Sequence, residues 1–134
     1  VCDSIPDLLH VKDLTSLIQA LVIGLCNHYE NGTQLPYLDS WIIHENKWRS
    51  TRYGMDAKLI INEDGEQKEI KEIIKDTIKA LEPEINFLNA GESMDRILNF
   101  INSKNPYYKK QIEIFNDEQN FKNILIDNIE RLKK

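Results

Sequence analysis

The part of the sequence best suited to chemistry is residues 45–57, where arginines, an asparagine and aromatic residues are concentrated. On an α-helix, residues three or four positions apart lie on the same face. One such face would carry Asn46, Arg49 and Tyr53, and the neighbouring strip would carry Arg52. The planar guanidinium group of arginine can donate two parallel hydrogen bonds to a carboxylate or a phosphate. The spacing is therefore compatible with a helix that binds an oxyanion.

Each of these side chains also has a purely structural interpretation. Glu45 precedes Arg49 by four residues, and such pairs are common on solvated helix faces, where they contribute little to stability. Arg52 could pair with Asp56 and hold the turn that follows the helix. Asn46 could cap or bridge the hairpin that follows in the sequence. The spacing alone leaves both interpretations open.

The cysteines and histidines form no motif typical of a disulfide framework or a metal site. Cys26 lies within an apolar helical pattern and is expected to be a buried free thiol, and Cys2 has no CxxC partner. The three histidines lack metal-binding spacing and are His10, His28 and His44. We therefore expect no metal site on this chain, and the two thiols favour a reducing, cytoplasmic compartment.

A long helix is predicted before this stretch, from about residue 13 to residue 30. Its apolar residues recur at steps of three and four, which is typical of a helical face turned towards a core. These residues are Leu14, Leu17, Ile18, Leu21, Val22, Leu25 and Tyr29. Asn31 and Gly32 should end the helix, because glycine adopts the left-handed backbone conformation at little cost. Residues 1–12 are expected to be a strand end followed by a loop.

Residues 39–53 form the predicted helix that carries the arginines. Asp39 can cap its N-terminus, and Gly54 should end it. Trp48 and Tyr53 are expected to pack in the core, as large aromatic side chains usually do. The arginines would then face solvent or a substrate.

A small β-hairpin is predicted next. A β-rich run over residues 57–61 and a polar return segment over residues 66–68 flank an Asp64-Gly65 turn. The polar return segment suggests that this edge of the hairpin is exposed.

The rest of the chain is predicted to be helical. Pro83 should kink a helix or start a new one, because proline lacks the backbone donor that a helix interior needs. A further helix should open at Glu92 or Ser93, and Asn105-Pro106 should break it. Asp117 is the expected cap of the last helix.

Composition and charge exclude several classes of protein. The 17 Lys and Arg residues against 22 Asp and Glu residues give a net charge of −5, which is poorly suited to binding nucleic acid because the phosphate backbone repels it. No uninterrupted apolar run approaches the roughly 20 residues that cross a bilayer, so no membrane association is expected. The predicted fold class is mainly α with a small β-hairpin, in a single domain over residues 1–134.

Residues 46–57 resemble the C-terminal signature of the family 2 glutamate–cysteine ligases, which are carboxylate–amine ligases. That signature has an asparagine, an aromatic residue two positions later, and then Arg-aromatic-Gly-Leu-Asp-Ala. The matching residues here are Asn46, Trp48 and Arg52-Tyr53-Gly54-Met55-Asp56-Ala57. Met55 replaces the leucine, and Thr51 takes the place of a cysteine or alanine. Val1-Cys2-Asp3 resembles the end of a family strand in which a glutamate and an arginine come first.

The resemblance implies that the chain is the C-terminal fragment of an α+β ligase fold related to glutamine synthetase, inactive on its own. Such a ligase uses ATP and Mg²⁺ to phosphorylate the γ-carboxylate of glutamate. An amine such as cysteine then displaces phosphate and forms a γ-glutamyl amide. The metal-binding carboxylates would lie outside this chain. The implied partners are these small substrates and the remainder of the parent ligase, and a homodimer is a further possibility.

The resemblance also assigns roles to single residues. Arg52 is the first candidate for contact with a phosphate or a substrate carboxylate, and Arg49 is the second, so both are catalytic candidates. The candidates for binding substrate or ATP are Asn46, Tyr53, Gly54 and Asp3. Glycine at position 54 would let the backbone turn sharply out of the helix.

A second interpretation is a non-catalytic helical module that binds a protein partner, which the amphipathic helices and the acidic helical tail favour. A complete small enzyme is the least favoured class, because the sequence has no evident nucleophile–base pair, glycine-rich phosphate loop or carboxylate cluster. Binding of Mg-ATP to the isolated chain, measured by calorimetry, distinguishes that class from the other two.

Overall fold

The computed structural model describes residues 7–33, 37–103, 107–118 and 120–133. Four features predicted from the sequence lie outside these ranges: the strand end at the start of the chain, the candidate site residue Asp3, the thiol of Cys2, and the break at Asn105-Pro106. The expectations for them stay predictions.

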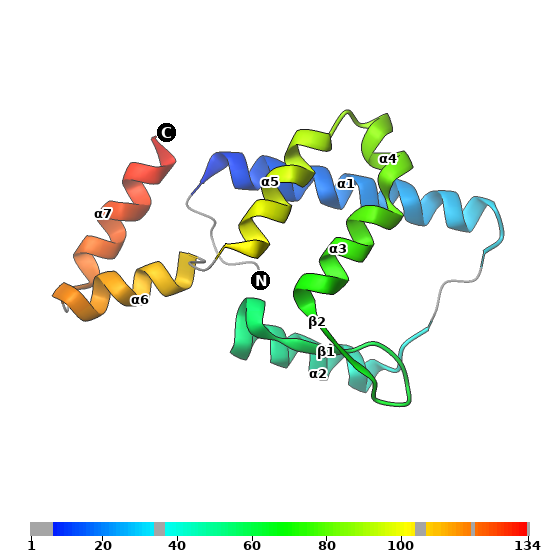
Figure 1. The fold of residues 1–134 in the computed structure, drawn as a ribbon, viewed down its shortest axis with the longest axis horizontal. Helices are drawn as coiled ribbons and strands as arrows, with labels where there is room; N and C mark the ends of the chain where they lie inside the picture. The colour runs from blue at the N-terminus through cyan, green and yellow to red at the C-terminus, as the bar shows by residue number, and fades with distance from the viewer. Residues whose placement is uncertain (1–6, 34–36, 104–106, 119, 134) are drawn as a thin grey trace.

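The described residues are mostly helical, with one two-stranded antiparallel hairpin, as the sequence predicts (Figure 1). The elements are α1 (Leu8–Glu30), α2 (Ser40–Tyr53), the short 3₁₀ helix η1 (Gly54–Asp56), β1 (Lys58–Ile60), β2 (Gln67–Glu69), α3 (Ile70–Ala80), α4 (Glu82–Phe87), α5 (Gly91–Asn102), α6 (Tyr107–Glu118) and α7 (Phe121–Leu132). In the hairpin, Leu59 of β1 pairs with Lys68 of β2.

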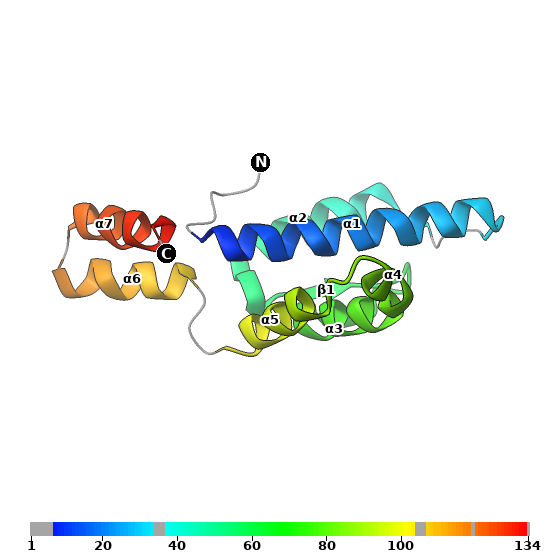
Figure 2. The same ribbon diagram turned by 90° about the horizontal axis from the view of Figure 1, so that it is seen from above.

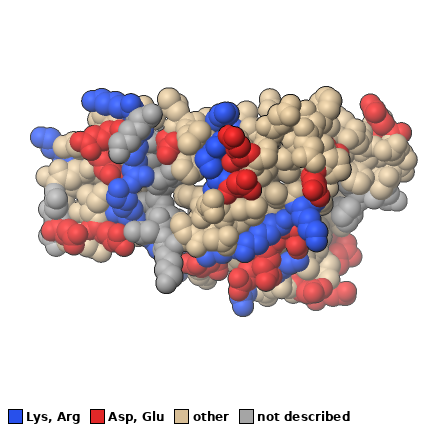
Figure 3. Space-filling view, turned by 45° about the horizontal axis from the view of Figure 1, so that its top comes forward, with Lys and Arg blue, Asp and Glu red and all other residues tan. Residues whose placement is uncertain are grey.

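The core lies between α1 and a layer made by α3, α4 and α5, which lie on one side of α1 in Figure 2. Its buried residues are Ala20, Ile78, Ile85, Ala90 and Met94. Helix α2 and the hairpin lie beside the start of α3, and α6 and α7 form a helical hairpin at one end of the molecule (Figures 1 and 2). On the face that Figure 3 shows, basic and acidic side chains lie interspersed, without a large patch of one sign.

Helix α1 begins earlier than the sequence predicts. The Asp7 carboxylate accepts hydrogen bonds from the backbone N–H groups of Leu9 (2.9 Å) and His10 (3.3 Å). This satisfies donors that the first turn of a helix leaves without intrahelical partners. The expected loop over residues 8–12 is therefore wrong, because the cap lies at Asp7.

The buried face of α1 differs from the predicted one. Ala20 and Gly24 are buried, and a Cβ atom added at Gly24 would lie 2.7 Å from Leu81 Cδ2. Small residues thus allow the close approach of the chain that follows α3. Most of the larger apolar residues of the predicted face, among them Ile18, are half-exposed. Cys26 is also exposed, so the expectation of a buried thiol is wrong.

Helix α1 is long and apolar enough to cross a membrane, which corrects the expectation that no segment comes near this. The core helix of a soluble protein can have the same length and composition, so a single helix of this kind is weak evidence for a membrane.

A buried ion pair joins α1 to α5. Asp13 is only 1% exposed, and its carboxylate accepts hydrogen bonds from Arg96 Nη2 at 2.7 Å and Nε at 2.9 Å. Arg96 Nη2 also donates to Ser93 Oγ at 3.2 Å. These hydrogen bonds from Arg96 hold the pKa of the Asp13 carboxyl below its usual value. The pair fixes the register of two helices that are far apart in the sequence.

The second half of the chain mostly follows the predicted pattern. Pro83 lies in the first turn of α4, so a new helix starts there, as one of the two predicted outcomes had it. Helix α5 begins at Gly91, one residue before the first predicted start. Asp117 is not the cap of the last helix, because it lies within α6. Asn120 caps α7 instead, by accepting a hydrogen bond from Lys122 N at 2.9 Å.

Candidate functional site

The helix that carries the arginines lies between Asp39 and Gly54. Asp39 is its N-cap residue, but no side-chain capping bond forms. Instead the Asp39 carbonyl accepts hydrogen bonds from Ile42 N (3.0 Å) and Ile43 N (3.3 Å), so the predicted carboxylate cap is wrong. Gly54 ends α2 as predicted, with φ 55° and ψ −129°, a conformation that side-chain-bearing residues avoid. The chain thereby turns into η1 and then into β1.

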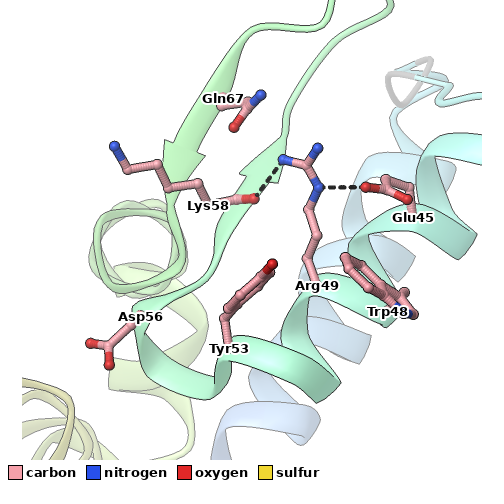
Figure 4. Close-up of a pocket in the computed structure, with 7 residues that line it drawn as sticks. All are labelled: Glu45, Trp48, Arg49, Tyr53, Asp56, Lys58 and Gln67. Carbon is pink, nitrogen blue, oxygen red and sulfur yellow. Dashed lines mark hydrogen bonds and ion pairs between the residues drawn. The ribbon is translucent and has the colours of Figure 1, made fainter.

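A cavity of about 360 Å³ opens between α2, η1 and the β-hairpin (Figure 4). Its lining residues are Glu45, Trp48, Arg49, Tyr53, Asp56, Lys58 and Gln67. Two predicted site residues, Arg49 and Tyr53, line it and extend side by side from α2 (Figure 4). The structure therefore brings part of the predicted site together in one concave place.

Asn46 holds the hairpin against α2. Its Nδ2 donates to the Ile60 carbonyl at 2.8 Å, and its Oδ1 accepts from Ile60 N at 2.8 Å. The side chain thus pairs with the backbone as a neighbouring strand would. The bridging alternative for Asn46 is confirmed, and both ends of its amide are engaged within the chain.

Replacing Asn46 by alanine is expected to lower the free energy of unfolding by about 2 kcal/mol, because it leaves both polar groups of the buried Ile60 backbone without these partners. Urea unfolding followed by circular dichroism measures the change. A matched control is Asn62→Ala, which removes hydrogen bonds from an exposed turn and should cost much less. Equal losses in the two variants would contradict the bridging role.

Arg49 is held by partners within the chain. Its Nε donates to Glu45 Oε1 at 2.8 Å, and its Nη1 donates to the Lys58 carbonyl at 3.1 Å (Figure 4). The predicted pair four residues apart is therefore confirmed. Because two of its donors are engaged, the guanidinium of Arg49 is fixed in place with only part of its hydrogen-bonding capacity facing the cavity.

Arg52 is not among the residues that line this cavity, but its guanidinium lies near two that do, Trp48 and Tyr53. Its guanidinium carbon lies 5.8 Å from the centre of the Trp48 ring and 6.0 Å from the centre of the Tyr53 ring. No ion pair of Arg52 is found among the described residues. The alternative in which Arg52 pairs with Asp56 is therefore wrong. An exposed guanidinium held over aromatic rings keeps its donors available to a ligand.

Trp48 and Tyr53 are half-exposed, at 53% and 49%, so the expectation that both are core residues is wrong. Their rings meet edge to face, with centroids 5.9 Å apart. They were expected in the core because of their size, but α2 buries mainly Ile42 and leaves this side open to the cavity. The two rings can support Arg52 or contact a substrate.

Asp56 has a role that the sequence did not indicate. Its carboxylate lies 3.2 Å from Lys109 Nζ of α6 and 3.9 Å from Lys71 Nζ of α3. In Figure 4 it points away from Arg49. Asp56 therefore links the turn after α2 to two later helices.

Lys58 and Gln67 line the cavity from the hairpin and were also missed. No motif marks them, and only the pairing of Ile60 with Gln67 and the contact of the hairpin with α2 bring them to this place. Arg49 and Lys58 offset the charges of Glu45 and Asp56, so the lining by itself is close to neutral. The exposed Arg52, which lies near the lining rings of Trp48 and Tyr53, adds a positive charge close to the cavity and so favours an anionic ligand.

The residues that the structure describes include no group of three or more histidines, cysteines, aspartates or glutamates placed to hold a metal ion.

Comparison with known proteins places this arrangement in a family. The family model described as "Glutamate-cysteine ligase family 2(GCS2)" matches residues 1–102, which include α2, the signature and the hairpin. Relatives named "Putative glutamate--cysteine ligase 2" followed by a paralogue number are found in several bacteria. That of Frankia alni is 29% identical over 111 residues, which cover 83% of this chain and 29% of the relative.

Two further relatives agree with this match. The protein of Nocardioides sp. is 32% identical over 97 residues, covering 72% of this chain and 26% of the relative. That of Paenarthrobacter aurescens is 26% identical over all 134 residues, which are 35% of its own length. No solved structure matches the chain. The chain thus spans between about a quarter and about a third of the length of these relatives, and it belongs to the glutamate–cysteine ligase family 2.

Proposed function

We propose that this chain is the C-terminal part of an ATP-dependent carboxylate–amine ligase that joins glutamate to an amine such as cysteine. The observation that carries the proposal is the position of Arg52. This residue lies in the family signature, and its exposed guanidinium lies near two exposed rings that line a cavity. Arg49, by contrast, is engaged by Glu45 and the backbone. A free guanidinium beside a concave site suits a carboxylate or phosphate oxygen.

In the proposed reaction, ATP transfers a phosphoryl group to the γ-carboxylate of glutamate. The amine then attacks the resulting acyl phosphate, an amide bond forms, and phosphate leaves. The role of this chain is to place the Arg52 donors on carboxylate or phosphate oxygens as negative charge develops there. The Tyr53 hydroxyl faces the cavity and can orient the same group (Figure 4).

The described residues do not fit the Mg²⁺ ion that this chemistry needs, because they offer no cluster of carboxylates. The proposal therefore assigns the metal to the part of the ligase that this chain lacks. Asn46 and Arg49 are better suited to positioning than to binding, since each is held by the hairpin. A cytoplasmic location and a homodimeric ligase stay predictions.

The proposal is tested by amide formation. The chain is combined with the remaining part of the family sequence encoded in the same genome, and γ-glutamyl amide is measured with glutamate, cysteine, ATP and Mg²⁺. We expect product from the combined protein and none from the chain alone. A combined protein that assembles but forms no amide with any of the common amino acids would contradict the proposal.

The alternative of a non-catalytic interaction module is favoured by one observation, the exposed apolar residues on α7, among them Phe121, Leu125 and Ile129. These residues lie four positions apart and form a stripe on one helical face. Under this alternative, the combined protein would lack ligase activity while the chain still binds a protein through α7.

A further inference from the structure

Helix α1 has two apolar faces, of which only one is covered by the other residues that the structure describes. The buried face carries Ala20 and Gly24 and packs against the chain around α4 and α5. A helix advances about 100° per residue, so Ile18 and Val22, two positions either side of Ala20, point to the opposite side. They are 51% and 53% exposed.

This outer face is long and uncharged. Its exposed apolar residues, called here the outer stripe, are Val11, Ile18, Val22, Leu25 and Tyr29. No lysine, arginine, aspartate or glutamate occurs from Leu14 to Tyr29. A helix face that stays in water normally carries charged residues opposite its apolar stripe, and a contiguous exposed apolar surface marks an interaction site.

Two occupants of stated chemistry fit such a stripe, a lipid bilayer and the apolar face of a protein. The contacts on the other side of α1 favour the protein. Asp13 is buried in its pair with Arg96, and Asn27 Nδ2 donates to Glu84 Oε1 of α4 at 2.9 Å. A bilayer that surrounded α1 would have to break these polar contacts, whereas a protein that covers only the outer stripe leaves them intact.

We propose that the outer stripe of α1 is the surface on which the remaining two-thirds of the ligase packs. This inference rests on the proposed function. The length of the relatives supports it, since the chain spans only 26% to 35% of them. The family match includes α1, so the helix belongs to the part that the longer proteins share. In the assembled ligase α1 is then a central helix covered on both sides.

The test measures binding between this chain and the remaining part of the family sequence from the same genome, expressed as a separate polypeptide. The variant Ile18→Glu/Val22→Glu is expected to raise the dissociation constant by about 10-fold or more, because two charges would be buried in an apolar contact. The same variant should keep the circular dichroism spectrum and melting temperature of the isolated chain, since both positions are exposed in it.

The matched control is Leu125→Glu/Ile129→Glu, which makes the same chemical change at two exposed positions of α7. It should leave the binding nearly unchanged. Equal losses in the two double variants would overturn the assignment to α1, because any exposed apolar residue would then contribute.

The remaining outcomes separate the two proposals. If the segments bind and form amide but the α1 variant binds as tightly as the wild type, this inference fails and the proposed function stands. If the segments neither bind nor form amide, or the genome encodes no such segment, both fail. Flotation of the wild-type chain with vesicles of phosphatidylcholine and phosphatidylglycerol would assign the outer stripe to a membrane and overturn the inference. A homodimer of the wild-type chain that is lost in the α1 variant would assign the outer stripe to a second copy, and would overturn the inference as well.

Discussion

Replacing Arg52 by alanine in the assembled ligase is expected to lower kcat/KM by about 100-fold or more, the usual effect of removing a donor that stabilises developing negative charge. The fold should be nearly unaffected. Arg52 is exposed, and its only interactions described are with the faces of Trp48 and Tyr53, which are worth about 0.5–1 kcal/mol at exposed sites. Steady-state kinetics and a melting curve of the same variant measure both effects.

Two further variants separate the shape of the Arg52 side chain from its charge. Arg52→Lys keeps the charge but loses the planar pair of donors, so it should recover only part of the activity. Lys47→Ala removes an exposed cation from the same helix and serves as the matched control, with activity close to the wild type. Unchanged turnover in Arg52→Ala would remove Arg52 from the site.

Replacing Asp13 by alanine should lower the free energy of unfolding by about 3 kcal/mol. This is the lower end of the range for breaking a buried ion pair, because the Arg96 side chain is 31% exposed and can reach water after the change. Urea unfolding followed by circular dichroism measures the loss. The matched control is Asp76→Ala, which breaks an exposed pair with Lys68 and should cost less than about 1 kcal/mol.

The Asp13–Arg96 pair also predicts how stability depends on pH. Hydrogen bonds from Arg96 lower the pKa of Asp13 in the folded chain below the ordinary value of 3.8. Between the lowered pKa and the ordinary value, the unfolded chain therefore binds a proton at Asp13 more readily than the folded chain does. The contribution of the ion pair to the free energy of unfolding is complete above about pH 4 and is lost as the pH falls through the lowered pKa. The difference in unfolding free energy between wild type and Asp13→Ala should shrink below pH 4. A constant difference down to pH 2 would contradict this account.

The sequence determined the local elements because their signals lie within a few residues of each other. Apolar spacing predicted the helices, the Asp64-Gly65 turn predicted the hairpin, and Gly54 predicted the end of α2. The signature from Asn46 to Ala57 predicted the family by residue type and order, and the family match confirms it. None of these features depends on how distant segments meet.

The tertiary structure decided which interpretation of each side chain holds. Asn46 and Arg49 became supports of the hairpin because Ile60 and Lys58 came to lie against α2. Asp56 found its partners in α3 and α6 rather than in Arg52. A polar side chain forms hydrogen bonds or ion pairs with whichever groups the fold brings within reach. Spacing along one helix cannot show a partner on another element.

The same reason explains α1. Its apolar residues surround the helix, so periodicity does not show which side is buried, and the predicted face is the one with the larger residues. The fold instead buries the side where Ala20 and Gly24 let neighbouring chain approach closely, and where Asp13 meets Arg96 83 residues later. Composition thus determined that α1 is apolar, whereas close packing against distant helices decided which of its faces the described part of the chain covers.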